Sequence, residues 1–239
     1  MKNLITLVAV VFFFVSCNVS FKGDSLSGNG NIKTETRNIG SFHGVETSGS
    51  IDIEISSGDN FSVSVEDDEN ILPVVVTEVE NGILNVHYKD NTSINNDHAK
   101  VYVKAPTLDK IISSGSANVM ITDVVKNAHE IEINLSGSGD IEGGVDAPKI
   151  SASIGGSGNI SLKGRTKDFD AKIGGSGDIK CSDLQSENTS VSIAGSGNAH
   201  VFASVHLKAN TVGSGDIYYR GNPQSPEINS IGSGSVKPE

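Results

Sequence analysis

Gly175-Ser176-Gly177-Asp178-Ile179 is the stretch that decides the fold, because close copies of it recur along the C-terminal half of the chain. Counted at the third position of each copy, the spacings are 22, 19, 19, 20, 18 and 19 residues. A repeat of this length is typical of a solenoid, in which each coil buries its apolar face only against neighbouring coils. The copies begin at Gly115, Gly137, Gly156, Gly175, Gly195, Gly213 and Gly232, the first being the degenerate Gly-Ser-Ala-Asn-Val.

Apolar residues flank each of these boxes at alternating positions and align in columns from one repeat to the next. Because successive side chains of a strand point to opposite faces, such columns predict the inward faces of stacked parallel strands. Glycine at the corner between strands tolerates positive φ, so every coil can turn at the same place. We therefore predict an all-β, single-domain parallel β-helix, or β-solenoid, with coils of about 19 residues. One column is Ile141, Ile160, Ile179, Ala199, Ile217 and Val236; another is Leu135, Ile154, Ile173 and Ile193.

The residue after the second box glycine alternates strictly between two types along the repeats: Asn118, Asp140, Asn159, Asp178, Asn198 and Asp216. Two ionised carboxylates stacked about 4.8 Å apart would repel by roughly 3 kcal/mol at an effective dielectric near 20. An amide between two carboxylates can donate hydrogen bonds to them instead. We therefore predict a mixed Asn/Asp structural ladder at these six positions.

A calcium site is the alternative for the same boxes. Residues 155–159 and 174–178 resemble the Gly-Gly-x-Gly-x-Asp motif of calcium β-rolls. Those rolls repeat every nine residues and stack acids at each turn, whereas this chain repeats at about 19 and inserts Asn or Ser. We therefore predict no metal site and no other cofactor.

The N-terminus predicts export and a lipid anchor. Lys2 precedes an apolar run of about 12 residues, Leu4–Val15, which is too short to span a bilayer. Phe14-Val15-Ser16-Cys17 resembles a bacterial lipobox, in which the cysteine is lipidated, so the membrane is an expected partner through Cys17. The alternative is ordinary secretion with an incidental cysteine.

These features divide the chain into three parts. We assign 1–16 to a lipoprotein signal peptide, 17–31 to a flexible, polar and glycine-rich tether, and 32–239 to the solenoid head domain. Within the head, 111–236 holds the regular repeats and 32–110 a more irregular part.

The irregular part shows period-two segments that predict strands at 32–39, 51–55, 61–65, 83–88 and 100–104. Asn81-Gly82 is a two-residue hairpin signal between two of these segments. Acidic residues at 67–69 favour the start of one short helix over 71–79, whereas Pro73 and the β-branched run disfavour it.

Charge and cysteine content narrow the function classes. Removing residues 1–16 leaves 17 basic and 29 acidic residues, a net charge of −12. Nucleic acid is excluded as a partner because no basic face is in evidence. If Cys17 carries lipid, Cys181 has no disulfide partner, and its place in an inward column predicts a core residue.

The sequence contains few residue patterns that are typical of a catalytic site. Parallel β-helices of another family cleave acidic polysaccharides with clustered aspartates for calcium and a basic residue as proton acceptor, but no such cluster stands out here. The available cations are Lys163, Arg165, Lys180 and Arg220. His200 and His206 lie six residues apart in a coil and need not share a face. We predict no catalytic residue, and keep a pectin lyase-like polysaccharide-processing enzyme as the alternative.

Several segments together resemble the head GIN domain family. They are Phe42-His43-Gly44-Val45, the run 48–53, Asn70-Ile71-Leu72, the run 80–86 and the Gly-Ser-Gly boxes, and the similarity covers about 33 to 236. The resemblance implies an auto-transporter adhesin-type β-helical body on the envelope of a Gram-negative bacterium, and it supplies no binding residues. We expect a non-catalytic module that binds a surface glycan or a protein; a scaffold without a soluble ligand is a further possibility. Asn18 after the anchor cysteine favours the outer membrane.

Overall fold

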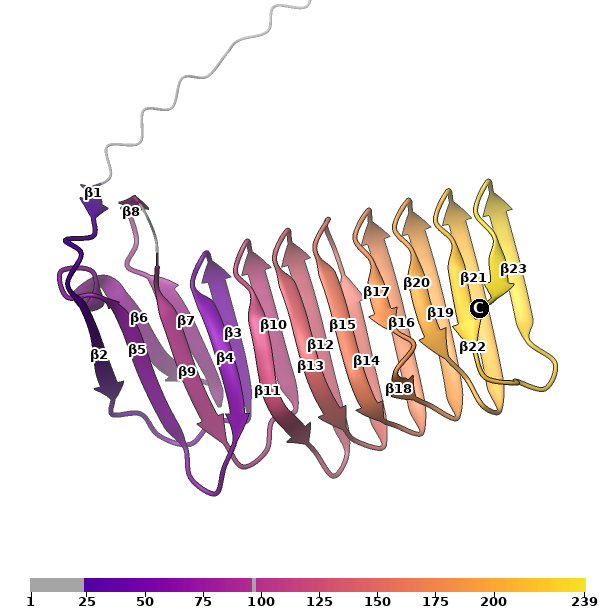
Figure 1. Ribbon diagram of the computed structural model, residues 1–239, viewed down its shortest axis with the longest axis horizontal. Coiled ribbons are helices and arrows are strands. Elements are labelled where there is room, and N and C mark those ends of the chain that lie inside the picture. Colours follow the sequence, from indigo (N-terminus) through magenta and orange to yellow (C-terminus); the bar gives the residue numbers. More distant parts are fainter. Residues whose placement is uncertain (1–23, 96–97) are drawn as a thin grey trace, which may run out of the picture.

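The computed structural model describes residues 24–95 and 98–239, which fold into a β-solenoid (Figure 1). Each regular coil contributes one strand to a ten-stranded sheet and one to a twelve-stranded sheet, and the two sheets face each other across the core. Neighbouring coils pair in parallel, so the predicted fold class, a parallel β-solenoid, is confirmed. The segment expected to be a signal peptide and Cys17, the expected lipidation site, lie outside the described residues.

The ten-stranded sheet carries the strand that leads into each Gly-Ser-Gly corner. Its strands, in spatial order, are β23 (Glu227–Gly232), β21 (His206–Gly213), β19 (Asn188–Gly195), β16 (Asp168–Gly175), β14 (Lys149–Ile154), β12 (Glu130–Gly137), β10 (Lys110–Gly115), β3 (Gly44–Gly49), β7 (Ile83–Tyr88) and β6 (Val75–Glu80).

The twelve-stranded sheet carries the strand that leaves each corner. Its strands, in spatial order, are β2 (Ile32–Arg37), β5 (Ser62–Asp68), β9 (Lys100–Ala105), β4 (Asp52–Ser57), β11 (Val119–Lys126), β13 (Asp140–Asp146), β15 (Asn159–Arg165), β17 (Ile179–Cys181), β20 (Ala199–Phe202), β22 (Ile217–Arg220) and β24 (Val236–Pro238), with β18 (Leu184–Gln185) beside β15.

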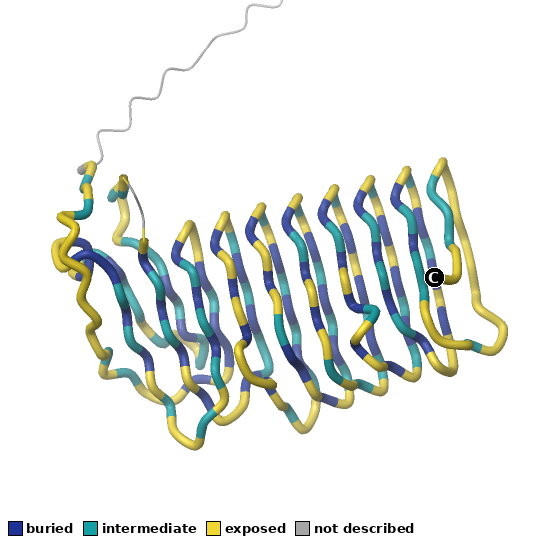
Figure 2. The backbone as a smooth tube through the Cα atoms, in the orientation of Figure 1, coloured by how far each residue is buried: buried dark blue, intermediate teal, exposed yellow. Residues whose placement is uncertain are grey.

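The apolar columns stack in the predicted register. Ile141 pairs with Ile160, which pairs with Ile179, and the column continues through Ala199 to Ile217. These five side chains are fully buried, and Figure 2 shows the same alternation of buried and exposed positions in the regular coils up to that of β21, whereas the last coil, with β23 and β24, has no buried position. Each coil is too small to fold alone, so stability depends on this continuous stack.

The Gly-Ser-Gly corners require glycine for two reasons: the backbone has a positive φ there, and the stacked coils leave no room for a Cβ atom. Gly137 has φ +149°, and a Cβ there would lie 1.9 Å from the carbonyl oxygen of Gly115 in the preceding coil. No such contact is tolerated by a real Cβ, so a side chain would push the two coils apart. The glycines therefore set the spacing of the coils at this corner.

Hydroxyl groups replace aliphatic side chains at one inward position near the corner. Thr47, Ser113 and Thr211 are fully buried. Each hydroxyl donates to the backbone carbonyl four residues further on, with distances of 2.9, 3.1 and 2.8 Å. A buried hydroxyl is costly only when it is unpaired, so these residues fit the core while fixing the turn.

The N-terminal part joins the solenoid out of chain order. The coil made of β7 and β9 lies next to the coil of β3 and β4, which in turn lies next to β10 and β11. The antiparallel strands β2, β5 and β6 then close this end. The predicted hairpin is present, with Asn81 and Gly82 both at positive φ between β6 and β7.

Two expectations for this part need correction. Instead of a helix over 71–79, the chain forms one 3-10 turn, η1 (Leu72–Val74), and then strand β6, because Pro73 sits at the start of the turn and the β-branched run that follows suits a strand. Residues 24–31, expected within the tether, join the body: β1 (Asp24–Ser27) pairs with β8 (Thr92–Asn95), and the Asn31 amide donates to Glu69.

Candidate functional site

The structure brings the six ladder residues together in one row along the Gly-Ser-Gly corner. Asn159 Nδ2 donates to Asp140 Oδ1 at 2.8 Å, and the Asp178 backbone N–H donates to Asn159 Oδ1 at 3.3 Å. The same two kinds of bond repeat at Asn198, whose Nδ2 lies 3.2 Å from Asp178 Oδ1. Each amide thus lies between two carboxylates and bonds to both coils.

The row extends further than the repeats indicated. Asp52 in β4 accepts from Asn118 Nδ2 at 3.2 Å although the two residues are 66 positions apart, so the Asp/Asn alternation begins one coil earlier. At the other end Ser235 donates to Asp216 Oδ1 from its hydroxyl and its backbone N–H, both at 2.7 Å. The Ser235 hydroxyl and N–H hold the pKa of the Asp216 carboxyl below its ordinary value, outweighing its partial desolvation.

The other residues that the sequence offered as candidates for catalysis or metal binding do not lie together in one site. Cys181 is fully buried, and burial raises the pKa of its thiol to about 12, which makes it a poor nucleophile. His200 lies in β20 and His206 in β21, so they belong to different sheets. Within 24–95 and 98–239, no group of three or more His, Cys, Asp or Glu side chains could hold a metal ion.

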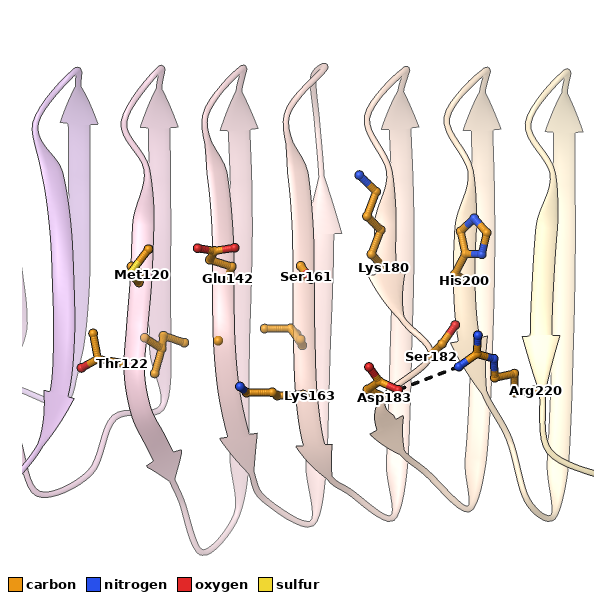
Figure 3. Close-up of a pocket in the computed structure, with 13 residues that line it drawn as sticks. Met120, Thr122, Glu142, Ser161, Lys163, Lys180, Ser182, Asp183, His200 and Arg220 are labelled. Atoms are coloured by element: carbon orange, nitrogen blue, oxygen red, sulfur yellow. Dashed lines mark ion pairs between the residues drawn. The ribbon is translucent and has the colours of Figure 1, made fainter. Parts of the chain in front are cut away.

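A groove with a volume of about 750 Å³ lies on the outer face of the twelve-stranded sheet (Figure 3). Strands β11, β13, β15, β17, β20 and β22 of six successive coils form its floor. Its lining residues include Met120, Glu142, Ser161, Lys163, Lys180, Ser182, Asp183, His200 and Arg220.

Side-chain size explains why this face is hollowed. One outward row runs Met120, Glu142, Ser161, Lys180 and His200, each paired with the next across neighbouring strands. The small Ser161 stands between longer side chains in this row, as Figure 3 shows, and Gly143 adds no side chain to the next position. The groove therefore lies over the small residues, and the longer side chains next to them form its sides.

The groove is richer in cations than the acidic chain as a whole. Lys163, Lys180 and Arg220 line it and are exposed, as are the acids Glu142 and Asp183. Arg220 Nη1 lies 3.9 Å from Asp183 Oδ1, the contact dashed in Figure 3. Counting Glu239, which contacts Arg220, the groove carries three cations and three carboxylates, so it is less acidic than the chain as a whole and suits a polar ligand.

The C-terminal end of the groove holds an aromatic pair and a carboxylate. The rings of His200 and Tyr218 stack with centroids 4.8 Å apart and planes 16° from parallel. Glu239 reaches the same place, where Arg220 Nε lies 3.1 Å from its Oε2. Desolvation opposes ionisation of Glu239, but bonds from Ser182, Arg220 and His200 outweigh it and keep the pKa of the carboxyl below its ordinary value.

Comparison with known proteins places this chain in a family. Residues 41–223 match the family model described as "Putative auto-transporter adhesin, head GIN domain". The chain belongs to the head GIN domain family. The expected resemblance is therefore confirmed, and the family description supports an adhesin-type protein of the cell surface or an exported one.

Several solved structures of other proteins share this fold. A "putative adhesin" from Bacteroides fragilis is 20% identical with a TM-score of 0.83, over 90% of this chain and 100% of that one. A "putative lipid binding protein" from Parabacteroides distasonis is 29% identical with a TM-score of 0.75, and a "putative adhesin" from the same species is 28% identical with a TM-score of 0.72; each match covers 90% of this chain and 100% of the other.

The remaining comparisons add two findings. No curated protein matches the chain. Across the part of the chain that the structure describes, no helix is long and apolar enough to cross a membrane.

Proposed function

We propose that this head GIN protein is a lipid-anchored, non-catalytic binding module of the cell envelope that takes a surface glycan into the groove of the twelve-stranded sheet. The groove is the observation that carries the proposal. It offers hydroxyl, amine, guanidinium and carboxylate groups over a long, shallow floor, with the stacked His200 and Tyr218 rings at one end. Sugars present both hydroxyl groups and flat C–H faces, which match polar side chains and amphipathic rings.

A lipid is the second candidate ligand, since one relative is described as a "putative lipid binding protein". The groove combines the exposed Met120 with the cations Lys163, Lys180 and Arg220 further along it, which would suit a charged headgroup. However, Ile121 and Leu162 are only 4% and 2% exposed, so Met120 is the exposed aliphatic side chain of the groove, and an acyl chain would otherwise meet the stems of charged residues. The glycan is therefore favoured.

Blocking the groove tests the glycan proposal. Ser161→Tyr places a bulky ring in the middle of the groove, and its matched control is Ser192→Tyr, an exposed serine on the outer face of the ten-stranded sheet. We expect Ser161→Tyr to lower glycan binding by at least about ten-fold on an array of surface polysaccharides, while Ser192→Tyr leaves it unchanged. Equal binding by both variants would refute the site.

The anchor and the location are tested separately. The lipobox-like segment ending at Cys17 supports lipidation, and two or more acyl chains would make anchoring stable. Cys17→Ser should abolish incorporation of a labelled fatty acid and release the protein from the outer-membrane fraction. Retention of both label and membrane association would contradict the proposal.

The absence of catalysis is also part of the proposal. A lyase-like interpretation draws no support from the family or from the described acids and histidines, which form no metal-binding group. Incubation with polygalacturonate, with and without calcium, should give no rise in absorbance from unsaturated products. Turnover would overturn the binding-only account.

A further inference from the structure

Glu239 occupies the C-terminal end of the groove as a carboxylate held by three different side chains. Ser182 Oγ donates to its Oε2 at 3.1 Å, Arg220 Nε lies 3.1 Å from the same oxygen, and His200 Nδ1 lies 3.5 Å from Oε1. The Glu239 backbone N–H donates to the Tyr219 carbonyl at 2.9 Å, so the residue is aligned along β22. The side chain thus docks into a set of donors formed by three coils.

The donor set has the composition of a carboxylate site. A guanidinium and a hydroxyl share one carboxylate oxygen, and an imidazole faces the other. Charge-assisted bonds of this kind are the strong ones in recognition of carboxylates. Lys180 lies in the same outward row as His200, so positive charge continues along the groove from this end.

The neighbouring rings supply a surface for a sugar. Tyr218 Oη donates to Asp216 Oδ2 at 3.2 Å, which fixes the ring that stacks on His200. A sugar ring lying against this pair would bring a substituent carboxylate within reach of Arg220. Neutral sugars could use the rings, but their hydroxyl groups would form weaker bonds with the donor set than a carboxylate does.

We propose that Ser182, His200 and Arg220 form a carboxylate subsite, that Glu239 fills it from within the chain, and that the groove takes a carboxylate-bearing glycan whose acid group displaces Glu239. This inference rests on the proposed glycan function and specifies its ligand class. Glu239 then acts as an internal competitor that sets the affinity.

Displacement is feasible because the contacts of Glu239 are near the surface. Its side chain is 32% exposed and that of Arg220 is 49% exposed. Exposed ion pairs contribute little stability, so the internal competitor weakens ligand binding by only about five-fold. A glycan with several carboxylates can compensate for this loss, because its other acid groups can bind Lys163 and Lys180.

The test measures binding of the full lipidated protein in detergent to two probes by calorimetry: oligogalacturonate and neutral malto-oligosaccharide. Glu239→Gln should bind oligogalacturonate about five-fold more tightly than wild type. Its control is Glu80→Gln, which removes the same charge from an exposed residue at the far end of the molecule and should leave affinity unchanged.

A second variant removes the subsite. Arg220→Gln should weaken oligogalacturonate binding by about ten-fold or more and leave any malto-oligosaccharide binding within two-fold. Arg165→Gln, an exposed arginine outside the groove, is the matched control. Melting temperatures of all variants within about 3 °C of wild type would show that the fold is intact.

The outcomes separate the two proposals. Binding of neutral sugar that Ser161→Tyr abolishes, with no effect of Glu239→Gln or Arg220→Gln on oligogalacturonate, would overturn the carboxylate subsite and leave the glycan function standing. Binding of neither sugar would overturn both. Binding to phosphatidylglycerol vesicles but to neither sugar would replace the glycan by an anionic lipid.

Discussion

The two halves of this solenoid are built from the same sheets but by different rules. In the regular coils from β12 to β21, each strand of the ten-stranded sheet pairs in parallel with the repeat before and after it in the chain. In the N-terminal part, β2 pairs with β5 antiparallel across about 30 residues, and the coil of β7 and β9 lies outside the coil of β3 and β4. Local sequence repeats therefore describe the first region and not the second.

This difference in strand pairing reflects a different structural requirement in each region. Regular coils need identical spacing, and they achieve it with glycine and the Asn/Asp row at the corner. The N-terminal part needs closure, and it achieves it with antiparallel strands and large side chains such as Phe42 and Phe61, whose rings lie 4.9 Å apart. Such closure covers the edges that a parallel ladder would leave open to other chains.

The largest expected effect on stability comes from substituting one box glycine of the regular coils, and it is compared with the same substitution at a glycine of the N-terminal part. Gly49 has φ +100°, but a Cβ added to it would meet nothing within 4 Å, whereas a Cβ at Gly137 would meet the Gly115 carbonyl. Gly49→Ala should lower the free energy of unfolding by about 1 kcal/mol through backbone strain alone, and Gly137→Ala by about 2–4 kcal/mol. Urea unfolding gives both values, and equal losses would contradict the stacking role of the regular boxes.

The next effect tests the alternation of amide and acid. Asn159→Asp would place three acids in a row from 140 to 178 and remove the amide that donates to Asp140. We expect a loss of about 1–2 kcal/mol at pH 7 and less at pH 4, because protonation relieves the repulsion.

Asn60→Asp, at an exposed turn of the N-terminal part, is the control and should change stability by less than about 0.5 kcal/mol at either pH. A loss from Asn159→Asp that is the same at pH 7 and pH 4 would remove the electrostatic explanation of the ladder.

The smallest effect belongs to an exposed pair in the N-terminal part. His43 Nδ1 lies 2.8 Å from Asp109 Oδ1, and this hydrogen bond raises the pKa of His43. A raised pKa means that the pair stabilises the fold below the unfolded value of about 6.5 and loses this contribution as pH rises through the folded value.

His43→Gln should therefore cost under about 1 kcal/mol at pH 5.5 and almost nothing at pH 8.5, measured by thermal melting. A destabilisation that grows from pH 5.5 to pH 8.5 would show that the His43–Asp109 charge pair is not the cause.

The sequence predicted the regular coils well because their determinants are local. The box around Gly177 and the inward columns recur at nearly constant spacing, so stacking and register follow directly. Asp52 was missed because Gly49-Ser50-Ile51-Asp52 lacks the second glycine and stands 66 residues before Asn118. The order of the N-terminal coils depends on contacts between distant segments, which no local pattern records.

The groove could be predicted only in part. The signal was available in the outward row of Met120, Glu142, Ser161, Lys180 and His200, where a small residue interrupts long ones. In the sequence alone, Arg220 is one of several scattered cations. Its meeting with Ser182 and Glu239 depends on how three coils superpose, and the 57 positions between Ser182 and Glu239 hide that contact from any spacing argument.

Hydrogen–deuterium exchange of the full-length protein, with and without saturating oligogalacturonate, tests the central claim that the regular coils carry the binding site. We predict slower exchange at the turn 182–183 and in β22, with no change across 24–105. Glu239→Gln should show the same protection at lower ligand concentration. Protection confined to the N-terminal part, or absent from the groove while ligand is bound, would contradict the account.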